Sequence, residues 1–123
     1  MNWINAFDVH YGEEEFKTVE SGIEAIQTVL SGEDIPAKER LLFYLDWYMD
    51  PYYKMDMSII GEPLKELLQR IVFTGETVGI IEEALHLLEA YTEGPYTILE
   101  KNIEDVAEEF KPTVLFLLNA DNG

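Results

Sequence analysis

The sequence predicts an all-α protein built from antiparallel helical hairpins, and three observations support this class. Apolar residues recur at intervals of three and four along almost the whole chain. Turn residues separate the apolar segments. No stretch alternates apolar and polar residues as a half-buried strand does. The hydrophobic fraction of 47% in a chain of 123 residues is enough for one core, so we expect a single domain over residues 1–123.

The first two helices are predicted on either side of Ser31-Gly32. The first follows an apolar stripe formed by Phe16, Val19, Ile23, Ile26 and Leu30. The second begins near Pro36, because proline suits the first helical positions. Its inward face is expected to contain Leu41, Leu45, Tyr48 and Tyr52, widened by Leu42 and Met49. Asp50-Pro51 should end or kink this helix, because the residue before proline avoids the helical conformation.

Three further apolar stripes predict helices in the rest of the chain. The first ends at Thr74-Gly75 and consists of Ile60, Leu64, Leu67, Leu68 and Ile71. The second ends at residues 93–95 and consists of Val78, Ile81, Leu85 and Leu88. The third consists of Leu99, Ile103, Val106 and Phe110. Pro112 is expected to interrupt the chain before a last short apolar turn over residues 114–118.

The apolar stripes repeat at a spacing of about 40 residues. The stripe that contains Ile60 matches those that contain Val19 and Leu99, and the stripe near Pro36 matches the one near Glu76. Two helices per unit at this period are typical of HEAT and armadillo repeats, so we predict a short solenoid. A bundle of five or six helices is the alternative. The first unit is expected to be capped by Trp3, Ile4 and Phe7.

Charge is the strongest feature of the composition. Twenty-five acidic residues face eight basic ones, which gives a formal net charge of −17, and the carboxylates are spread along the chain. Such a field repels nucleic-acid phosphates and anionic membranes and attracts basic surfaces. We therefore expect a basic protein partner, and neither nucleic acid nor a membrane. Solubility alone is the alternative explanation of the charge.

The composition also limits the compartment. The chain has no cysteine, so disulfides and thiolate metal sites are excluded. Its first residues lack a basic segment followed by a long apolar stretch, so we expect no signal peptide. The longest apolar stretches, such as residues 114–118, are too short to cross a bilayer. The expected location is the cytoplasm.

No pattern typical of a catalytic site is present. Ser21, Ser31 and Ser58 lack a glycine-rich elbow, and glycine-rich phosphate loops are absent. Glu83 and His86 have the Glu-x-x-His spacing that places both on one helical face, but di-iron bundles need this pair twice, with further glutamates. We interpret the single copy as solvated surface residues. We therefore expect no enzyme, no metal site and no cofactor.

The aromatic and acidic segment 43–53 is the first candidate binding site. Beside the inward stripe, the other faces of its helix hold Phe43, Asp46, Trp47, Asp50 and Tyr53. Aromatic rings flanked by carboxylates suit a basic protein surface, because they provide rigid apolar area beside charge. Large rings also pack between helices, and we expect this role for Phe43. For Asp46, Trp47, Asp50 and Tyr53 both roles stay open.

An acidic wall is the second candidate binding site. It is expected on the exposed sides of three equivalent helices and consists of Glu20 and Glu24, then Glu62 and Glu66, then Glu104, Asp105 and Glu108. In a solenoid such helices lie side by side, so their carboxylates would form one continuous surface. Stacked like charges cost stability unless a basic partner relieves them. A merely solvated face is the alternative.

Segments 41–48 and 81–90, in corresponding repeat positions of a short acidic chain, resemble HEAT-like immunity proteins of bacterial polymorphic toxin and contact-dependent inhibition systems. The resemblance spans residues 14–118 and implies a protein that binds a cognate toxin domain and blocks its active site. Such toxins are often nucleases with cationic clefts. Carboxylates placed where phosphates would sit give fast, salt-sensitive docking. The alternatives are a nucleic-acid mimic that inhibits a DNA-binding enzyme and a non-catalytic helical adaptor.

Overall fold

The computed structural model describes the backbone of residues 13–122, with all their side chains except those of Tyr53 and residues 120–122. Every regular element in this part of the chain is a helix, so the all-α class is confirmed. The expected N-terminal cap lies outside the described residues; it comprises Trp3, Ile4 and Phe7.

The chain forms long helices joined by short turns and 3-10 segments. A helical segment at residues 13–21 comes first. The long helices that follow are α2 (Ile23–Leu30), α3 (Ile35–Tyr48), α4 (Gly61–Thr74), α5 (Val78–Tyr91) and α7 (Lys111–Asn122). The short elements are η1 (Pro51–Tyr53), α6 (Thr97–Lys101) and η2 (Ile103–Asp105).

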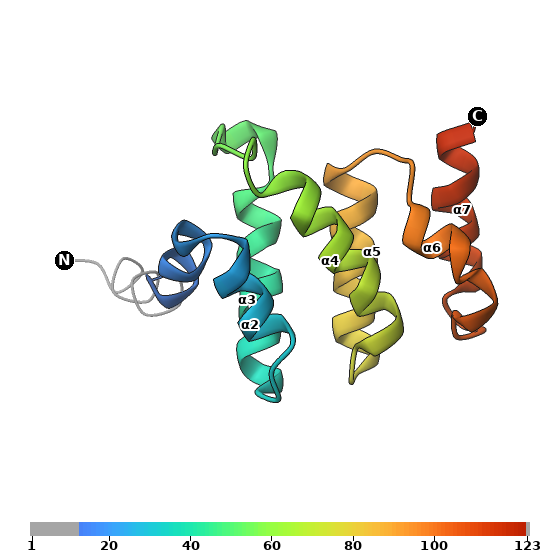
Figure 1. Cartoon of the computed structure of the whole chain (residues 1–123), viewed down its shortest axis with the longest axis horizontal. Coiled ribbons are helices and arrows are strands. Elements are labelled where there is room, and N and C mark those ends of the chain that lie inside the picture. Colours follow the sequence, from blue (N-terminus) through green and yellow to red (C-terminus); the bar gives the residue numbers. More distant parts are fainter. Residues whose placement is uncertain (1–12, 123) are drawn as a thin grey trace.

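The helices follow one another as antiparallel pairs along the molecule (Figure 1). Helix α2 packs on α3, α4 on α5, and α6 on α7. Neighbouring pairs are joined by contacts of α4 with α2 and α6, and of α5 with α3 and α7. The spacing of the pairs is uneven, because α3, α5 and α7 begin at residues 35, 78 and 111. Membership of the HEAT or armadillo type therefore stays a prediction.

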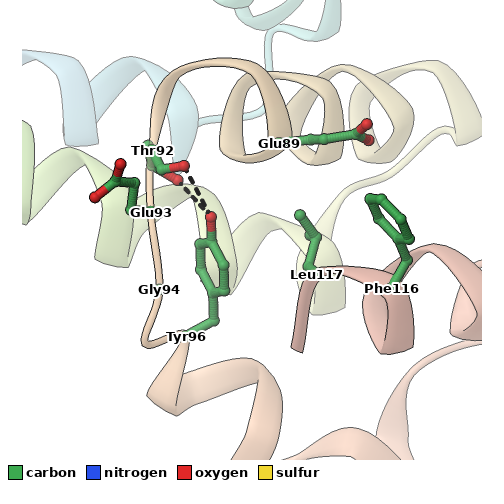
Figure 2. Close-up of a pocket in the computed structure, with 7 residues that line it drawn as sticks. All are labelled: Glu89, Thr92, Glu93, Gly94, Tyr96, Phe116 and Leu117. Atoms are coloured by element: carbon green, nitrogen blue, oxygen red, sulfur yellow. Dashed lines mark hydrogen bonds between the residues drawn. The ribbon is translucent and has the colours of Figure 1, made fainter. Parts of the chain in front are cut away.

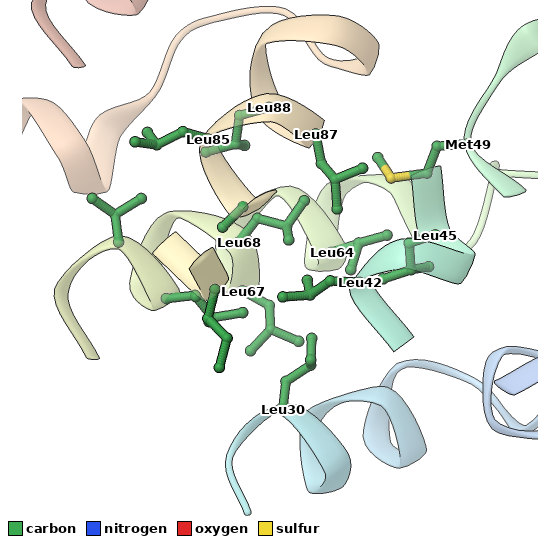
Figure 3. Close-up of a cluster of buried hydrophobic side chains, with 14 of the residues drawn as sticks. Leu30, Leu42, Leu45, Met49, Leu64, Leu67, Leu68, Leu85, Leu87 and Leu88 are labelled. Carbon is green, nitrogen blue, oxygen red and sulfur yellow. The ribbon is translucent and has the colours of Figure 1, made fainter. Parts of the chain in front are cut away.

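One apolar core runs through these helix pairs. Figure 3 shows its centre, where leucines of α2, α3, α4 and α5 point toward one another. The fully buried side chains include Ile26, Leu42, Leu64, Leu88, Leu99 and Val114. Most residues of the predicted apolar stripes are buried, so the helical periodicity identified the core correctly.

The predicted first helix is wrong in one respect, because it breaks at Gly22. This residue has φ 105° and separates the segment 13–21 from α2. Such a φ favours glycine, which has no Cβ to clash with the backbone. Before the break, Val19 still reaches the core, whereas Phe16 of the same predicted stripe is exposed.

The predicted helix through Leu99 and Phe110 is also interrupted. Helix α6 ends at Lys101, and the side-chain nitrogen of Asn102 donates to the carbonyl of Ile98 at 2.9 Å. Asparagine often ends helices in this way, because its side chain competes for backbone groups. The expected interruption before the last apolar segment is present, because residues 106–110 are not helical. Pro112 lies just after it, in the first turn of α7, where a missing N–H has no cost.

An ion pair between a buried lysine and an exposed glutamate connects the start of α3 to the start of α5. The side chain of Lys38 is buried, and its ammonium donates to both carboxylate oxygens of Glu76, at 2.7 Å for Oε1. These hydrogen bonds hold the pKa of Glu76 below its usual value of 4.5. The next residue, Thr77, caps α5 by accepting from the backbone N–H of Ile80 at 3.1 Å.

We expect Glu76→Gln to lower the free energy of unfolding at neutral pH, because it leaves the buried Lys38 ammonium without its ionic partner. The folded-state pKa of Glu76 is depressed, so its contribution is present above the unfolded pKa and is lost as the pH falls through the folded value. Urea denaturation of both proteins at several pH values measures the difference. A difference that persists in acid would contradict this account, and Lys38→Met/Glu76→Gln should recover much of the loss.

Candidate functional site

The outer face of α3 presents aromatic and acidic side chains together. Phe43 is 76% exposed and Trp47 is 40% exposed, one helical turn further on. The exposed carboxylate of Glu39 precedes Phe43 by one turn, so the three lie on one face. We call this face, with the half-buried Asp46 and Asp50, the α3 surface.

The expectation that Phe43 packs between helices is therefore wrong. Leu41, Leu42 and Leu45 take the inward side of α3 and are almost completely buried. Position 43 is about 200° around the helix from positions 41 and 45, so it points to solvent. The sequence held a signal for this, because Glu39, Phe43 and Trp47 recur at intervals of four outside the apolar stripe.

Trp47 is supported from within α3. Its ring lies 5.5 Å from that of Tyr44, measured between centroids, and Tyr44 lies 6.2 Å from Tyr48. Burial raises the pKa of Tyr44 to about 12, so this ring stays uncharged at neutral pH. A supported ring loses less side-chain freedom when it binds, and this favours its use as an anchor.

The end of α3 is shaped by Asp50 and Pro51. The carboxylate of Asp50 accepts from the backbone N–H of Tyr52 at 2.9 Å and so caps η1. Proline ends the α-helix here as predicted. The expectation that Tyr52 points inward is wrong: it lies beyond this break and is 81% exposed. The side chain of Tyr53 lies outside the described part of the chain.

Asp46 connects the α3 surface to helix α5. Its Oδ1 accepts from the hydroxyl of Tyr91 at 2.7 Å and lies 3.1 Å from Nε2 of His86. The hydrogen bond raises the pKa of Tyr91 to about 12. Glu83, one turn before His86, is half-buried, and burial raises the pKa of its carboxyl. Sequence reasoning found Asp46 but missed Tyr91, because the two residues are 45 positions apart.

The α4 part of the predicted acidic wall lies beside a groove. Glu62 and Glu66 are exposed and line a space of about 1070 Å³, together with Met49 and Tyr91. Tyr91 thus lies between this groove and Asp46, so the two candidate sites are neighbours. Glu66 pairs with Arg70 at 2.8 Å, which offsets part of its charge.

The rest of the predicted wall does not lie on equivalent helices. Glu104 and Asp105 belong to η2 and Glu108 follows it, because α6 ends at Lys101. All three are exposed. Glu108 pairs with Lys111 at 3.2 Å. Glu20 precedes the break at Gly22. Of the residues predicted to form the wall, Glu24, Glu62 and Glu66 therefore lie on helices that pack against each other, α2 and α4.

A smaller pocket of about 350 Å³ lies between α5 and α7 (Figure 2). Two of its polar side chains, Thr92 and Tyr96, form hydrogen bonds at the end of α5. Thr92 Oγ1 donates to the carbonyl of Leu88 at 2.6 Å, and the Tyr96 hydroxyl lies 3.2 Å from the same oxygen. Carbonyls at the end of a helix need such partners, so this arrangement acts as a cap.

No protein-family model, curated protein or solved structure matches this chain. In the described part of the chain, no helix is both long enough and apolar enough to span a membrane. The interpretation of the α3 surface therefore depends on its own geometry.

We expect Phe43→Ser to change the free energy of unfolding by less than about 0.5 kcal/mol, because the ring contributes little to the core. The matched control is Leu42→Ser, one position earlier, where a fully buried side chain becomes polar. That variant should lose several kcal/mol, roughly as large-to-small core substitutions do. Urea denaturation measures both. Equal losses at the two positions would show that Phe43 is part of the core.

Proposed function

We propose that this protein is a non-catalytic binding protein of the immunity type, which neutralises a basic toxin domain through the α3 surface. The observation that carries the proposal is the exposure of Phe43 beside Trp47 on an acidic helix face. Single exposed apolar residues are common on protein surfaces, but neighbouring exposed rings on one face are typical of interaction sites.

The chemistry of the α3 surface suits lysine and arginine side chains. Phe43 and Trp47 offer apolar area and ring faces that attract cations. Asp46, Asp50 and Glu39 provide negative charge around them. Aromatic side chains at the centre of an interface contribute most of its binding energy, and the residues around them exclude water. The net charge of −17 adds long-range attraction for a basic partner and speeds its association.

The exposed rings favour a protein partner over the alternative of nucleic-acid mimicry. A mimic of the phosphate backbone needs regularly placed charges, because phosphate contacts dominate DNA affinity. Two neighbouring aromatic side chains add nothing to that imitation. They do add affinity against a folded domain, where a ring can enter a pocket and exclude water.

We expect the chain to protect cells against a toxin domain encoded beside its gene. In co-expression, the native chain should restore growth and bind the purified toxin domain. Phe43→Ser/Trp47→Ser should weaken binding by at least about 10-fold, which corresponds to ~1.4 kcal/mol. Ile59→Ser is the matched control, because this residue is also exposed but lies outside the α3 surface. Surface plasmon resonance measures both.

Charge variants separate the two candidate faces in the same assay. Glu39→Lys/Asp50→Lys should weaken binding at low salt and make the remaining affinity less sensitive to salt, because part of the electrostatic attraction is removed. Glu62→Lys/Glu66→Lys should have the smaller effect of the two if the α3 surface is the binding face. An affinity that does not change between low and high salt would exclude an acidic-surface mechanism. The absence of any neighbouring toxin-like reading frame would contradict the immunity role.

A further inference from the structure

Asp46, Glu83 and His86 form a cluster of metal-ligating side chains between α3 and α5. One ligand atom of each residue lies within 4.8 Å of the ligand atoms of the other two. Glu83 and His86 are one turn apart on α5, and Asp46 faces them from α3. The closest pair is Asp46 Oδ1 and His86 Nε2, at 3.1 Å.

We propose that this cluster binds a Zn²⁺ ion. Zinc takes carboxylate oxygens and imidazole nitrogens at about 2.0–2.2 Å, so two ligand atoms in a tetrahedral site are roughly 3.3 Å apart. The distance of 3.1 Å between Asp46 Oδ1 and His86 Nε2 is already close to this value, and the other separations stay within 4.8 Å. Three protein ligands leave one tetrahedral position for water. The imidazole nitrogen favours zinc over magnesium and calcium, which prefer oxygen ligands alone.

Charge supports a divalent cation at this place. Asp46 and Glu83 are both half-buried, and two carboxylates in such a site repel each other unless a cation lies near. Among the described residues, neither carboxylate forms an ion pair with a lysine or an arginine.

Tyr91 orients the ligands from outside the cluster. Its hydroxyl donates to Asp46 Oδ1 at 2.7 Å, and its ring meets that of His86 edge-on with centroids 6.1 Å apart. Partners of this kind fix the direction of metal ligands and raise the affinity of a site. Tyr91 is therefore a positioning residue. The side chains of His86 and Asp46 are 50% and 34% exposed, which leaves an entry path for the ion.

This inference departs from the expectation, drawn from the sequence, that no metal site exists. That expectation compared the single Glu-x-x-His pair with di-iron bundles, which require two pairs. A mononuclear zinc site needs only one. The third ligand, Asp46, lies 40 positions before His86, so no local spacing connects them.

Isothermal titration of the full chain with ZnCl₂ tests the site. We expect one zinc ion per chain. His86→Ala, Asp46→Asn and Glu83→Gln should each lower the affinity by more than about 10-fold. Glu82→Gln is the matched control, because this exposed carboxylate is the neighbour of Glu83 on the same helix. It should leave the affinity unchanged. Unaltered circular dichroism in each variant excludes unfolding as the cause.

Nuclear magnetic resonance distinguishes zinc bound at His86 from zinc attracted loosely to the acidic surface, because only the first shifts the signals of one histidine. The chain has two histidines, and zinc should shift the Nε2 signal of His86 but not the imidazole signals of His10. Tyr91→Phe should weaken zinc binding by about 10-fold without changing the stoichiometry. Equal binding of Mg²⁺, unaltered binding by His86→Ala, or no one-to-one binding would each overturn the proposal.

Discussion

The burial of α5 against three other helices is the constraint on which the rest of the structure depends. Helix α5 packs on α3, α4 and α7, and its contact with α4 is the most extensive in the described chain. Ala84, Leu87 and Leu88 are fully buried. Buried side chains are packed closely in protein interiors, so a change of size at any of these positions would disturb the contacts of α5. This packing determines which faces of α3 and α4 are exposed to solvent.

Polar contacts at both ends of α5 fix its position relative to α3. At the N-terminal end, Lys38 of α3 pairs with Glu76 just before α5. At the C-terminal end, Tyr91 donates to Asp46. Buried apolar contacts are non-directional, so leucines alone would tolerate a shift of one helix along the other. Directional contacts at two separated points make such a shift costly. They also explain why Asp46 meets the same face of α5 as His86.

The sequence was sufficient for the features that depend on local pattern. The apolar periodicity identified the core positions, and Pro36, Pro51 and Gly75 marked helix ends. Proline does so because its ring fixes φ and removes the N–H, and glycine does so because ordering its freer backbone in a helix costs more entropy. At the predicted first helix, a single backbone position overrode the periodicity. The left-handed φ of Gly22 ended a stripe that otherwise continued smoothly, and the periodicity contained no sign of it.

The candidate sites were harder to predict, because they depend on which helix meets which. The orientation of Phe43 follows once the inward residues of α3 are known, and its four-residue spacing from Glu39 and Trp47 was visible in the sequence. The contact of Asp46 with Glu83 and His86 was not visible in the sequence. It requires the packing and register of α3 on α5, which buried leucines and two distant polar contacts determine together.

Asp46 belongs both to the α3 surface and to the proposed zinc cluster, so the two proposals are physically linked. A zinc ion at Asp46 would offset negative charge at the edge of the α3 surface and so weaken its attraction for a basic partner. Conversely, a lysine or arginine that binds Asp46 would compete with the metal. The proposals can still be separated by experiment, because Phe43 lies outside the cluster and His86 lies outside the α3 surface. Substitution of either residue perturbs one function and leaves the ligands of the other in place.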